Sequence, residues 1–483
     1  MPPRRTESSV KLSTGTVRGD QAEGVRRFLG IPYAAAPIGD LRFAEPAPVA
    51  PWVHERDATT PGATAPQYPY DGGMERFLGT TIVPGDDFLN LNVWAPAKGS
   101  RLPVMVWIHG GSFIHGSNAL DAYDGTTFAR DGIVFVAINY RLGAEGFSVL
   151  DGAPTNLGIA DQLAALRWVQ TEIAAFGGDP AKVTVFGESA GGSSVATLLA
   201  HPDARSLFTR AVVQSGPLSA KPAKEAGRIS RLMAKKLGIK PTRDAFAAKT
   251  PQELLDAQKA VMAGSNPIMG GPGFAPSVGG AFVPRNPEEA LQTGAGRDIP
   301  LMIGATSEEY RLWFMPSGLM DRVNSALLLA ARAKFGIGRR VYAPYRRNRP
   351  DASPGEMLGV LATDVILRLP LTRLADARLG RGAATWVYEF AWRSPVEDLG
   401  AAHAMELGFV FDGLARPDSI ALAGDDAPQS LADAMHAAWV AFATHGDPGW
   451  RRWNEKRPVQ VFDEEGAHLV EAPREDERSA WPR

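Results

Sequence analysis

Short and nearly continuous apolar runs recur along the chain, separated by polar and glycine-rich segments. The clearest runs cover residues 91–94, 103–108, 133–138, 183–186, 211–213, 301–303, 386–390 and 459–462. Runs of this length suit strands that are buried on both faces of a sheet. Between Asp161 and Phe176 apolar residues recur at helical spacing, which predicts an amphipathic helix that ends at Gly177. Strands that alternate with helices predict an α/β fold, a large and mostly parallel sheet covered by helices on both faces.

The remaining segments are interpreted as attachments to this sheet. Residues from about 10 to 30 mix apolar and polar positions at short spacing, which predicts an N-terminal hairpin. The segments at about 220–297 and 315–369 are helical in pattern and interrupted by proline. We expect them to leave the sheet and form a helical roof over a site. With no repeat or linker in the 483 residues, we expect a single domain over 1–483.

Composition excludes several classes of function. The net charge is −2, and such a balance attracts neither nucleic acid nor an anionic membrane. No apolar run approaches the roughly 18 residues of a membrane helix, and the basic start is not followed by the apolar stretch of an export signal. Cysteine is absent, which excludes disulfides, thiolate metal sites and a cysteine nucleophile. We expect a cytoplasmic protein without metal or cofactor, as a monomer or weak homo-oligomer.

The most informative motif is Gly-x-Ser-x-Gly, with Ser189 at its centre. Gly187 and Gly191 flank the serine, a predicted strand precedes them and a helix-compatible stretch follows. A sharp strand-to-helix turn strains the serine backbone and leaves little room for neighbouring side chains, so glycines are required. The alternative is a glycine- and serine-rich turn without chemistry. The strand before and the helix after favour a serine nucleophile, which predicts covalent catalysis.

A serine nucleophile needs N–H donors for the oxygen that becomes negative in the tetrahedral intermediate. The backbone N–H of Ala190 is one candidate, because it follows the nucleophile. Gly111 and Ser112 supply two more, in a small-residue loop that follows the 103–108 strand. The alternative is a tight loop that only turns the chain. We predict an oxyanion hole formed by the three N–H groups.

These motifs and several further blocks resemble the type-B carboxylesterase and cholinesterase family of α/β-hydrolases. In length and short loops the chain is most similar to the para-nitrobenzyl-esterase-like bacterial members. The resemblance implies an α/β-hydrolase fold and a serine carboxylesterase that acts on small-molecule esters. The blocks that carry it are residues 30–34, 37–43, 86–93, 139–143, 156–162, 176–180 and 214–216.

The resemblance also assigns the other two members of a catalytic triad. The acid of the family matches Glu309 in residues 304–310, with Glu308 as the fallback because the two carboxylates are adjacent. Tyr310 departs from the pattern, because the family has glycine there. The base matches His403, and the chain order serine, acid, histidine is that of α/β-hydrolases.

The substrate pocket and the bond that is cleaved are less determined by the sequence. Glu188, Phe113, Trp313 and Phe409 are candidates for the pocket, although ordinary core packing explains the aromatic residues equally well. An amide or carbamate hydrolase with the same triad is an alternative, because fold and triad do not determine the leaving group. A non-catalytic, neuroligin-like binding protein is a second alternative, which the presence of the serine and histidine disfavours.

Overall fold

A computed structural model describes residues 5–265 and 270–482. Residues 1–4, which begin the basic N-terminal stretch, and 266–269, which belong to the predicted roof segment 220–297, lie outside the described residues. The strands are β1 (Thr6–Lys11), β2 (Thr16–Ala22), β3 (Val25–Pro32), β4 (Arg56–Asp57), β5 (Asn90–Pro96), β6 (Leu102–Ile108), β7 (Val134–Ile138), β8 (Gly178–Glu188), β9 (Arg210–Gln214), β10 (Lys221–Pro222), β11 (Ser277–Val278), β12 (Leu301–Thr306), β13 (Thr385–Phe390), β14 (Pro458–Asp463) and β15 (Gly466–Glu471).

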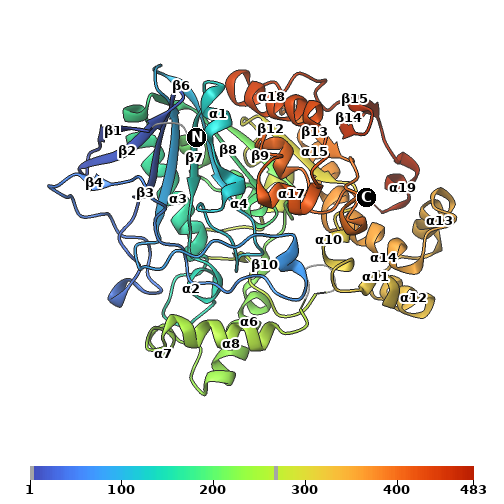
Figure 1. The fold of residues 1–483 in the computed structure, drawn as a ribbon. Helices are drawn as coiled ribbons and strands as arrows, with labels where there is room; N and C mark the ends of the chain where they lie inside the picture. Colours follow the sequence, from blue (N-terminus) through green and yellow to red (C-terminus); the bar gives the residue numbers. More distant parts are fainter. Residues whose placement is uncertain (1–4, 266–269, 483) are drawn as a thin grey trace.

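Within the described residues the main sheet has 13 strands, in the order β1-β2-β3-β5-β7-β6-β8-β9-β12-β13-β14-β15, with β4 beside β2. The seven neighbouring strands β7, β6, β8, β9, β12, β13 and β14 are parallel to one another. The edge strands β1, β2, β3, β5 and β15 pair antiparallel along the sheet, and β4 lies parallel to β2. The mostly parallel α/β fold is therefore confirmed, with antiparallel additions at both edges. The predicted hairpin corresponds to three antiparallel strands, β1 to β3, at one side of the molecule (Figure 1).

Helices surround the sheet, and several of the longer ones pack on its two faces. They are α1 (Thr126–Arg130), α2 (Gly143–Phe147), α3 (Leu157–Glu172), α4 (Ala190–Ala200), α5 (Ala204–Leu207), α6 (Ala223–Leu237), α7 (Arg243–Ala247), α8 (Pro251–Met262), α9 (Pro287–Gln292), α10 (Arg311–Phe314), α11 (Leu319–Arg322), α12 (Ser325–Lys334), α13 (Arg339–Asn348), α14 (Pro354–Thr363), α15 (Leu369–Leu379), α16 (Leu407–Val410), α17 (Pro417–Ala423), α18 (Gln429–His445) and α19 (Glu475–Ala480). In Figure 1, α6 to α8 lie below the sheet and α11 to α14 lie to one side of it.

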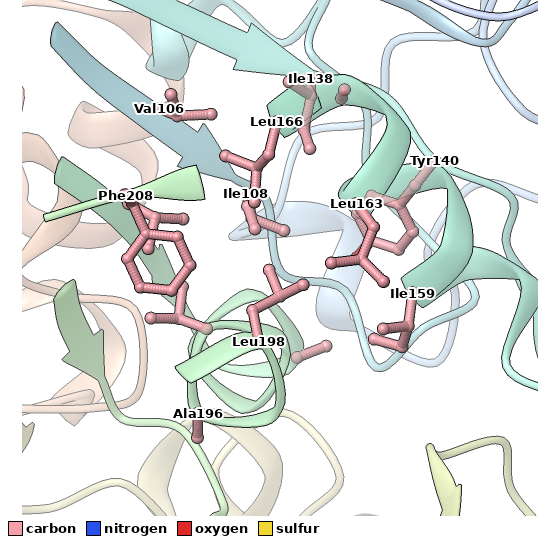
Figure 2. Packing of buried hydrophobic residues seen from close by; sticks show 14 of the residues in the cluster. Val106, Ile108, Ile138, Tyr140, Ile159, Leu163, Leu166, Ala196, Leu198 and Phe208 are labelled. Atoms are coloured by element: carbon pink, nitrogen blue, oxygen red, sulfur yellow. The ribbon is translucent and has the colours of Figure 1, made fainter. Parts of the chain in front are cut away.

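The central strands are buried on both faces because their side chains alternate between two hydrophobic clusters. In β6, Val106 and Ile108 face a cluster that includes residues of α3 and α4 (Figure 2). Met105 and Trp107 belong to the second cluster, which includes residues of α16 and α18. A strand covered on both sides reads as a continuous apolar run, and this is why the runs predicted the sheet.

The predicted helix over 161–176 differs from the structure at both ends. It begins four residues earlier, at Leu157, after Asn156, whose backbone is left-handed with φ 62° and whose side chain pairs with Ser277. Its α-helical part ends at Glu172, and a 3₁₀ turn continues to Phe176. The first turn is buried all round and therefore lacks an amphipathic pattern, so the spacing of apolar residues could not indicate it.

In the parts of the chain that the structure describes, none of the helices has the length and apolar character that crossing a bilayer requires.

Candidate active site

Ser189 lies in a strained turn between β8 and α4. Its backbone has φ 57° and ψ −121°, a conformation that residues with side chains seldom adopt. A Cβ atom on Gly191 would lie 1.9 Å from the carbonyl oxygen of Ile108, and one on Gly187 would lie 2.6 Å from the same oxygen. Both glycines are therefore required by close backbone contact. The turn places Ser189 at the N-terminus of α4, where the helix dipole favours developing negative charge, and on the wall of a large cavity.

The loop after β6 presents backbone N–H groups near this serine. Gly111 has φ 106°, and a Cβ atom there would lie 2.2 Å from the carbonyl oxygen of His115. Ser112 and Ala190 line the same cavity as Ser189. Among the described residues, no backbone hydrogen bond uses the N–H of Gly111, Ser112 or Ala190 as donor. The three predicted donors thus lie on two neighbouring turns and have no partner within this part of the chain.

Glu309 and His403 lie in direct contact. One carboxylate oxygen of Glu309 accepts a hydrogen bond from the Thr306 N–H at 2.8 Å, and the other contacts Nδ1 of His403. The backbone N–H of His403 donates a hydrogen bond to the backbone oxygen of Glu309 at 3.3 Å. Glu308 points elsewhere, because its carboxylate pairs with Nε of Arg311 at 2.9 Å. The geometry brings Glu309, not Glu308, to the imidazole.

Tyr310, where the resembling family has glycine, is accommodated without backbone strain. Its φ of −60° and ψ of −24° are ordinary helical values. The ring is buried against Phe314, with centroids 5.5 Å apart. Gly359 of α14 supplies the space, because a Cβ atom there would lie 2.1 Å from the Tyr310 ring.

Two further carboxylates surround His403. Oε1 of Glu188 lies 3.0 Å from Nε2 of His403, although the angles do not form a hydrogen bond. Glu406 is fully buried, and neither of its carboxylate oxygens has a hydrogen-bond partner among the described residues. Within the same residues no hydrogen bond joins the Ser189 hydroxyl to Nε2 of His403, a contact that often tightens only when substrate binds.

The pKa values of this cluster shift together. Burial alone would lower the pKa of His403, but the charges of Glu188 and Glu309 raise it above its ordinary value. Burial raises the pKa of Glu188 and that of Glu406, and the neighbouring negative charge of Glu309 adds to both. Each negative charge in this buried cluster disfavours ionisation of the other carboxyl groups and favours protonation of the imidazole. The protonation equilibria of His403, Glu188 and Glu406 are therefore linked.

His109, in the loop after β6, lies in a different environment from His403. It is buried, its Nδ1 lies 2.8 Å from the carbonyl oxygen of Gly110, and its ring stacks on Tyr140 with centroids 4.5 Å apart. Burial lowers the pKa of His109 to about 4. This histidine therefore stays neutral and supports the loop that carries Gly111.

Ser189, Glu309 and His403 border one cavity of about 370 Å³. Of the four predicted pocket residues, Phe113 and Trp313 line it, and the rings of Trp313 and His403 have centroids 4.7 Å apart. Glu188 is not part of its wall but contacts the imidazole.

The prediction that Phe409 lines the pocket is wrong. Phe409 is fully buried and packs against Phe390 and Trp392, with centroids 5.0 and 5.3 Å away. It follows His403 closely in the chain, but its ring turns into the hydrophobic core instead of the cavity.

Sequence reasoning missed several residues of this site. Glu406 stands only three residues after His403, which the resemblance had already assigned, so its place in the chain was a signal. The apolar wall from the two roof segments, which includes Met262, Phe274, Ile366 and Leu367, had no signal. These residues have the spacing of ordinary core positions.

No group of three or more His, Asp or Glu side chains in the described ranges is placed to hold a metal ion. The polar groups that meet in the cavity are instead those of acyl transfer: a hydroxyl, an imidazole, a carboxylate and unpartnered N–H donors.

The sheet order and the strand-to-helix turn that carries Ser189 define an α/β-hydrolase. The model of the carboxylesterase family matches residues 6–469. The chain belongs to the carboxylesterase family and is a carboxylic ester hydrolase of the serine carboxylesterase class. The amide or carbamate hydrolase and the neuroligin-like binding protein are not favoured.

Similar proteins support this assignment over nearly the full length. The para-nitrobenzyl esterase of Bacillus subtilis (strain 168) is 36% identical over 481 residues, which cover 95% of this chain and 96% of the relative. Phenmedipham hydrolase of Pseudarthrobacter oxydans is 34% identical, over 96% of this chain and 97% of the relative. The crystal structure of the carboxylesterase EST55 of Geobacillus stearothermophilus has a TM-score of 0.88 and 36% identity, and it covers 98% of this chain and 100% of that one.

Proposed function

We propose that Ser189, His403 and Glu309 are the catalytic triad of this esterase. The observation that carries the proposal is the contact of Glu309 with Nδ1 of His403 at the edge of the cavity that Ser189 lines. Glu309 is itself held by the Thr306 N–H, so it can keep the imidazole in the tautomer whose Nε2 accepts a proton. Glu308 is excluded from this role because its carboxylate is engaged by Arg311.

In the first step the Ser189 hydroxyl oxygen attacks the ester carbonyl carbon, and its proton passes to Nε2 of His403. The carbonyl oxygen becomes negative and accepts hydrogen bonds from the N–H groups of Gly111, Ser112 and Ala190. When the tetrahedral intermediate collapses, the C–O bond to the alcohol breaks and His403 donates the proton to that oxygen. The acyl group is then bound to Ser189 as an ester.

The second step reverses these roles with water. His403 accepts a proton from water, whose oxygen attacks the acyl carbon. The bond to Ser189 breaks, the proton returns to the serine oxygen and the acid leaves. Because Nε2 of His403 lies 3.0 Å from Glu188, the imidazole must exchange this contact for one to the Ser189 hydroxyl when substrate enters.

The molecule is further proposed to act as one α/β-hydrolase domain, in which the segments 220–297 and 315–369 roof the cavity. Residues of both segments contribute to the cavity wall, which supports this division. A cytoplasmic location and a monomeric or weakly associated state remain predictions from the sequence.

The triad is tested by Ser189→Ala with 4-nitrophenyl butyrate as substrate. The variant should lose about 10⁶-fold in kcat, as other serine triads do when the nucleophile is removed. Ser193→Ala, four residues further along and also on the cavity wall, is the matched control and should retain activity. More than a few per cent activity in Ser189→Ala would overturn the assignment.

A further inference from the structure

Between α14 and α15 the helix widens into a single π-helical turn, η5 (Asp364–Arg368). Such turns inside α-helices occur frequently at functional sites. The two faces of η5 border different spaces. Ile366 and Leu367 line the cavity that contains Ser189, whereas Asp364 and Arg368 border a second, smaller cavity of about 50 Å³.

The second cavity lies at the carboxyl ends of β12 and β13 and is rich in charged groups. Its charged lining residues are Asp364, Arg368, Glu389, Arg457, Arg474, Glu475 and Arg478. Acidic and basic groups are paired across it, because Arg368 contacts Asp364 and Arg474 contacts Glu389. This cavity is therefore bordered by a partly buried ionic network, which lies behind the wall of the first cavity.

Glu477 of α19 is a buried member of this network, because it contacts Arg368. Its side chain has 0% exposure. It accepts hydrogen bonds from Nδ2 of Asn348 at 2.9 Å and from Nη2 of Arg368 at 3.1 Å, and it also contacts Arg349. One buried carboxylate thus connects the end of α13 to the π-helical turn.

A second connection runs through Tyr345. The Tyr345 hydroxyl donates to Asp364, and it accepts from Nε1 of Trp481 at 2.8 Å. Asp364 and Tyr345 are both buried. Arg368 is therefore held by a residue of α19, and Asp364 is held by a tyrosine that contacts the residue directly after α19.

Such a network has few alternative arrangements. A buried charge that loses its partner is uncompensated in a medium of low dielectric, so each member constrains the others. The backbone of η5 cannot shift without breaking the contact of Asp364 with Tyr345 and the contact of Arg368 with Glu477. Because Ile366 and Leu367 belong to the same turn, their position on the cavity wall depends on these pairs.

We propose that Glu477, acting through Arg368, positions the π-helical wall of the substrate cavity and thereby sets how large an ester substituent the enzyme accepts. The inference rests on the proposed function, because it takes the cavity of Ser189 as the one that binds substrate. Glu477 is a positioning residue and not a catalytic one. An acetyl group fills a small part of a 370 Å³ cavity, whereas a long chain must use its apolar wall.

The test is the chain-length profile of Glu477→Gln. We would measure kcat and KM for 4-nitrophenyl acetate and octanoate, and for ethyl and octyl acetate, normalised to the concentration of sites labelled by a fluorophosphonate. Acetate turnover should stay within about twofold of wild type, and kcat/KM for a long-chain ester should fall about tenfold, mainly through KM. A variant that is merely less folded would lose activity on short-chain and long-chain esters equally. That loss would disappear when the rates are divided by the concentration of labelled sites.

Glu471→Gln is the matched control, because this exposed carboxylate pairs with Arg451 outside the network. Tyr345→Phe is the second variant, in case Glu477→Gln does not fold. It removes both hydrogen bonds of the hydroxyl, the one to Asp364 and the one from Trp481, without removing a charge. It should change the profile in the same direction by less. Adding Arg368→Lys to Glu477→Gln should not restore kcat/KM for long-chain esters, because the side chain at position 477 still lacks the carboxylate.

An unchanged ratio of long-chain to short-chain kcat/KM in both variants, in the acyl and in the alcohol series, would overturn the inference. Failure of the proposed function would look different. In that case the wild-type enzyme itself would show no labelling of Ser189, whatever the chain-length profile.

Discussion

The two adjacent carboxylates beside β12 provide a sharp test of the proposed triad. In Glu309→Gln the new amide has one oxygen and one NH₂ group. The Thr306 N–H, which donates to Oε1 of Glu309 at 2.8 Å, needs the oxygen as its acceptor. The NH₂ group must therefore face Nδ1 of His403. The imidazole can satisfy that donor only with Nδ1 unprotonated, which moves its hydrogen to Nε2.

An imidazole with its hydrogen on Nε2 cannot accept the proton of Ser189. The same tautomer reversal in a serine protease triad lowers kcat about 10⁴-fold, and we expect a loss of that order here. Glu308→Gln should keep most of the activity, because its carboxylate pairs with Arg311 and not with the imidazole. The loss of the Glu308–Arg311 pair should instead lower the free energy of unfolding.

The assay is steady-state hydrolysis of 4-nitrophenyl butyrate at a pH where the wild-type rate is maximal, with folding checked by circular dichroism. Loss of activity in Glu308→Gln with activity retained in Glu309→Gln would contradict the role of Glu309. A loss of less than about tenfold in Glu309→Gln would contradict it too, because the wrong tautomer cannot act as the base.

Three further predictions concern charge, packing and redox state. In Glu188→Gln the pKa of His403 should fall, because a neighbouring negative charge is removed. Since only the neutral imidazole is a base, the acidic limb of the kcat/KM profile should move to lower pH by about one pH unit. An acidic limb at the wild-type pH would contradict this. Gly359→Ala should destabilise the protein by about 1–3 kcal/mol in urea unfolding because its Cβ atom meets the Tyr310 ring. In a protein that already carries Tyr310→Ala, adding Gly359→Ala should cause no further loss of stability. An equal loss in that background would show that another contact is responsible. Dithiothreitol should leave activity unchanged because the chain has no cysteine, so thiol-dependent inactivation would point to a different cause.

Much of the fold and of the site could be predicted because the signals are local. Strands covered on both faces give continuous apolar runs, and the close contacts of Gly187 and Gly191 with the Ile108 carbonyl admit no other residue. A resemblance to a known family was needed to choose Glu309 and His403. Acid and base come from loops far apart in the chain, and the spacing of residues says nothing about which carboxylate meets which histidine.

The parts that could not be predicted depend on the direction of side chains. Phe409 and Trp313 are both aromatic and near active-site motifs, yet one ring enters the core and the other the cavity. The π-helical turn is another case. Ile366 and Leu367 have the pattern of a buried helix, and only the contact of Arg368 with Glu477 shows that one face of the turn is held by α19.

The most direct measurement is the location of the covalent intermediate. The enzyme would be mixed with a 4-nitrophenyl ester, quenched in acid within the first turnover and digested for peptide mass spectrometry. One acyl group is expected on the peptide that contains Ser189, and none in Ser189→Ala. An acyl group on another residue, or full hydrolysis by Ser189→Ala, would contradict the assignment of Ser189 as the nucleophile.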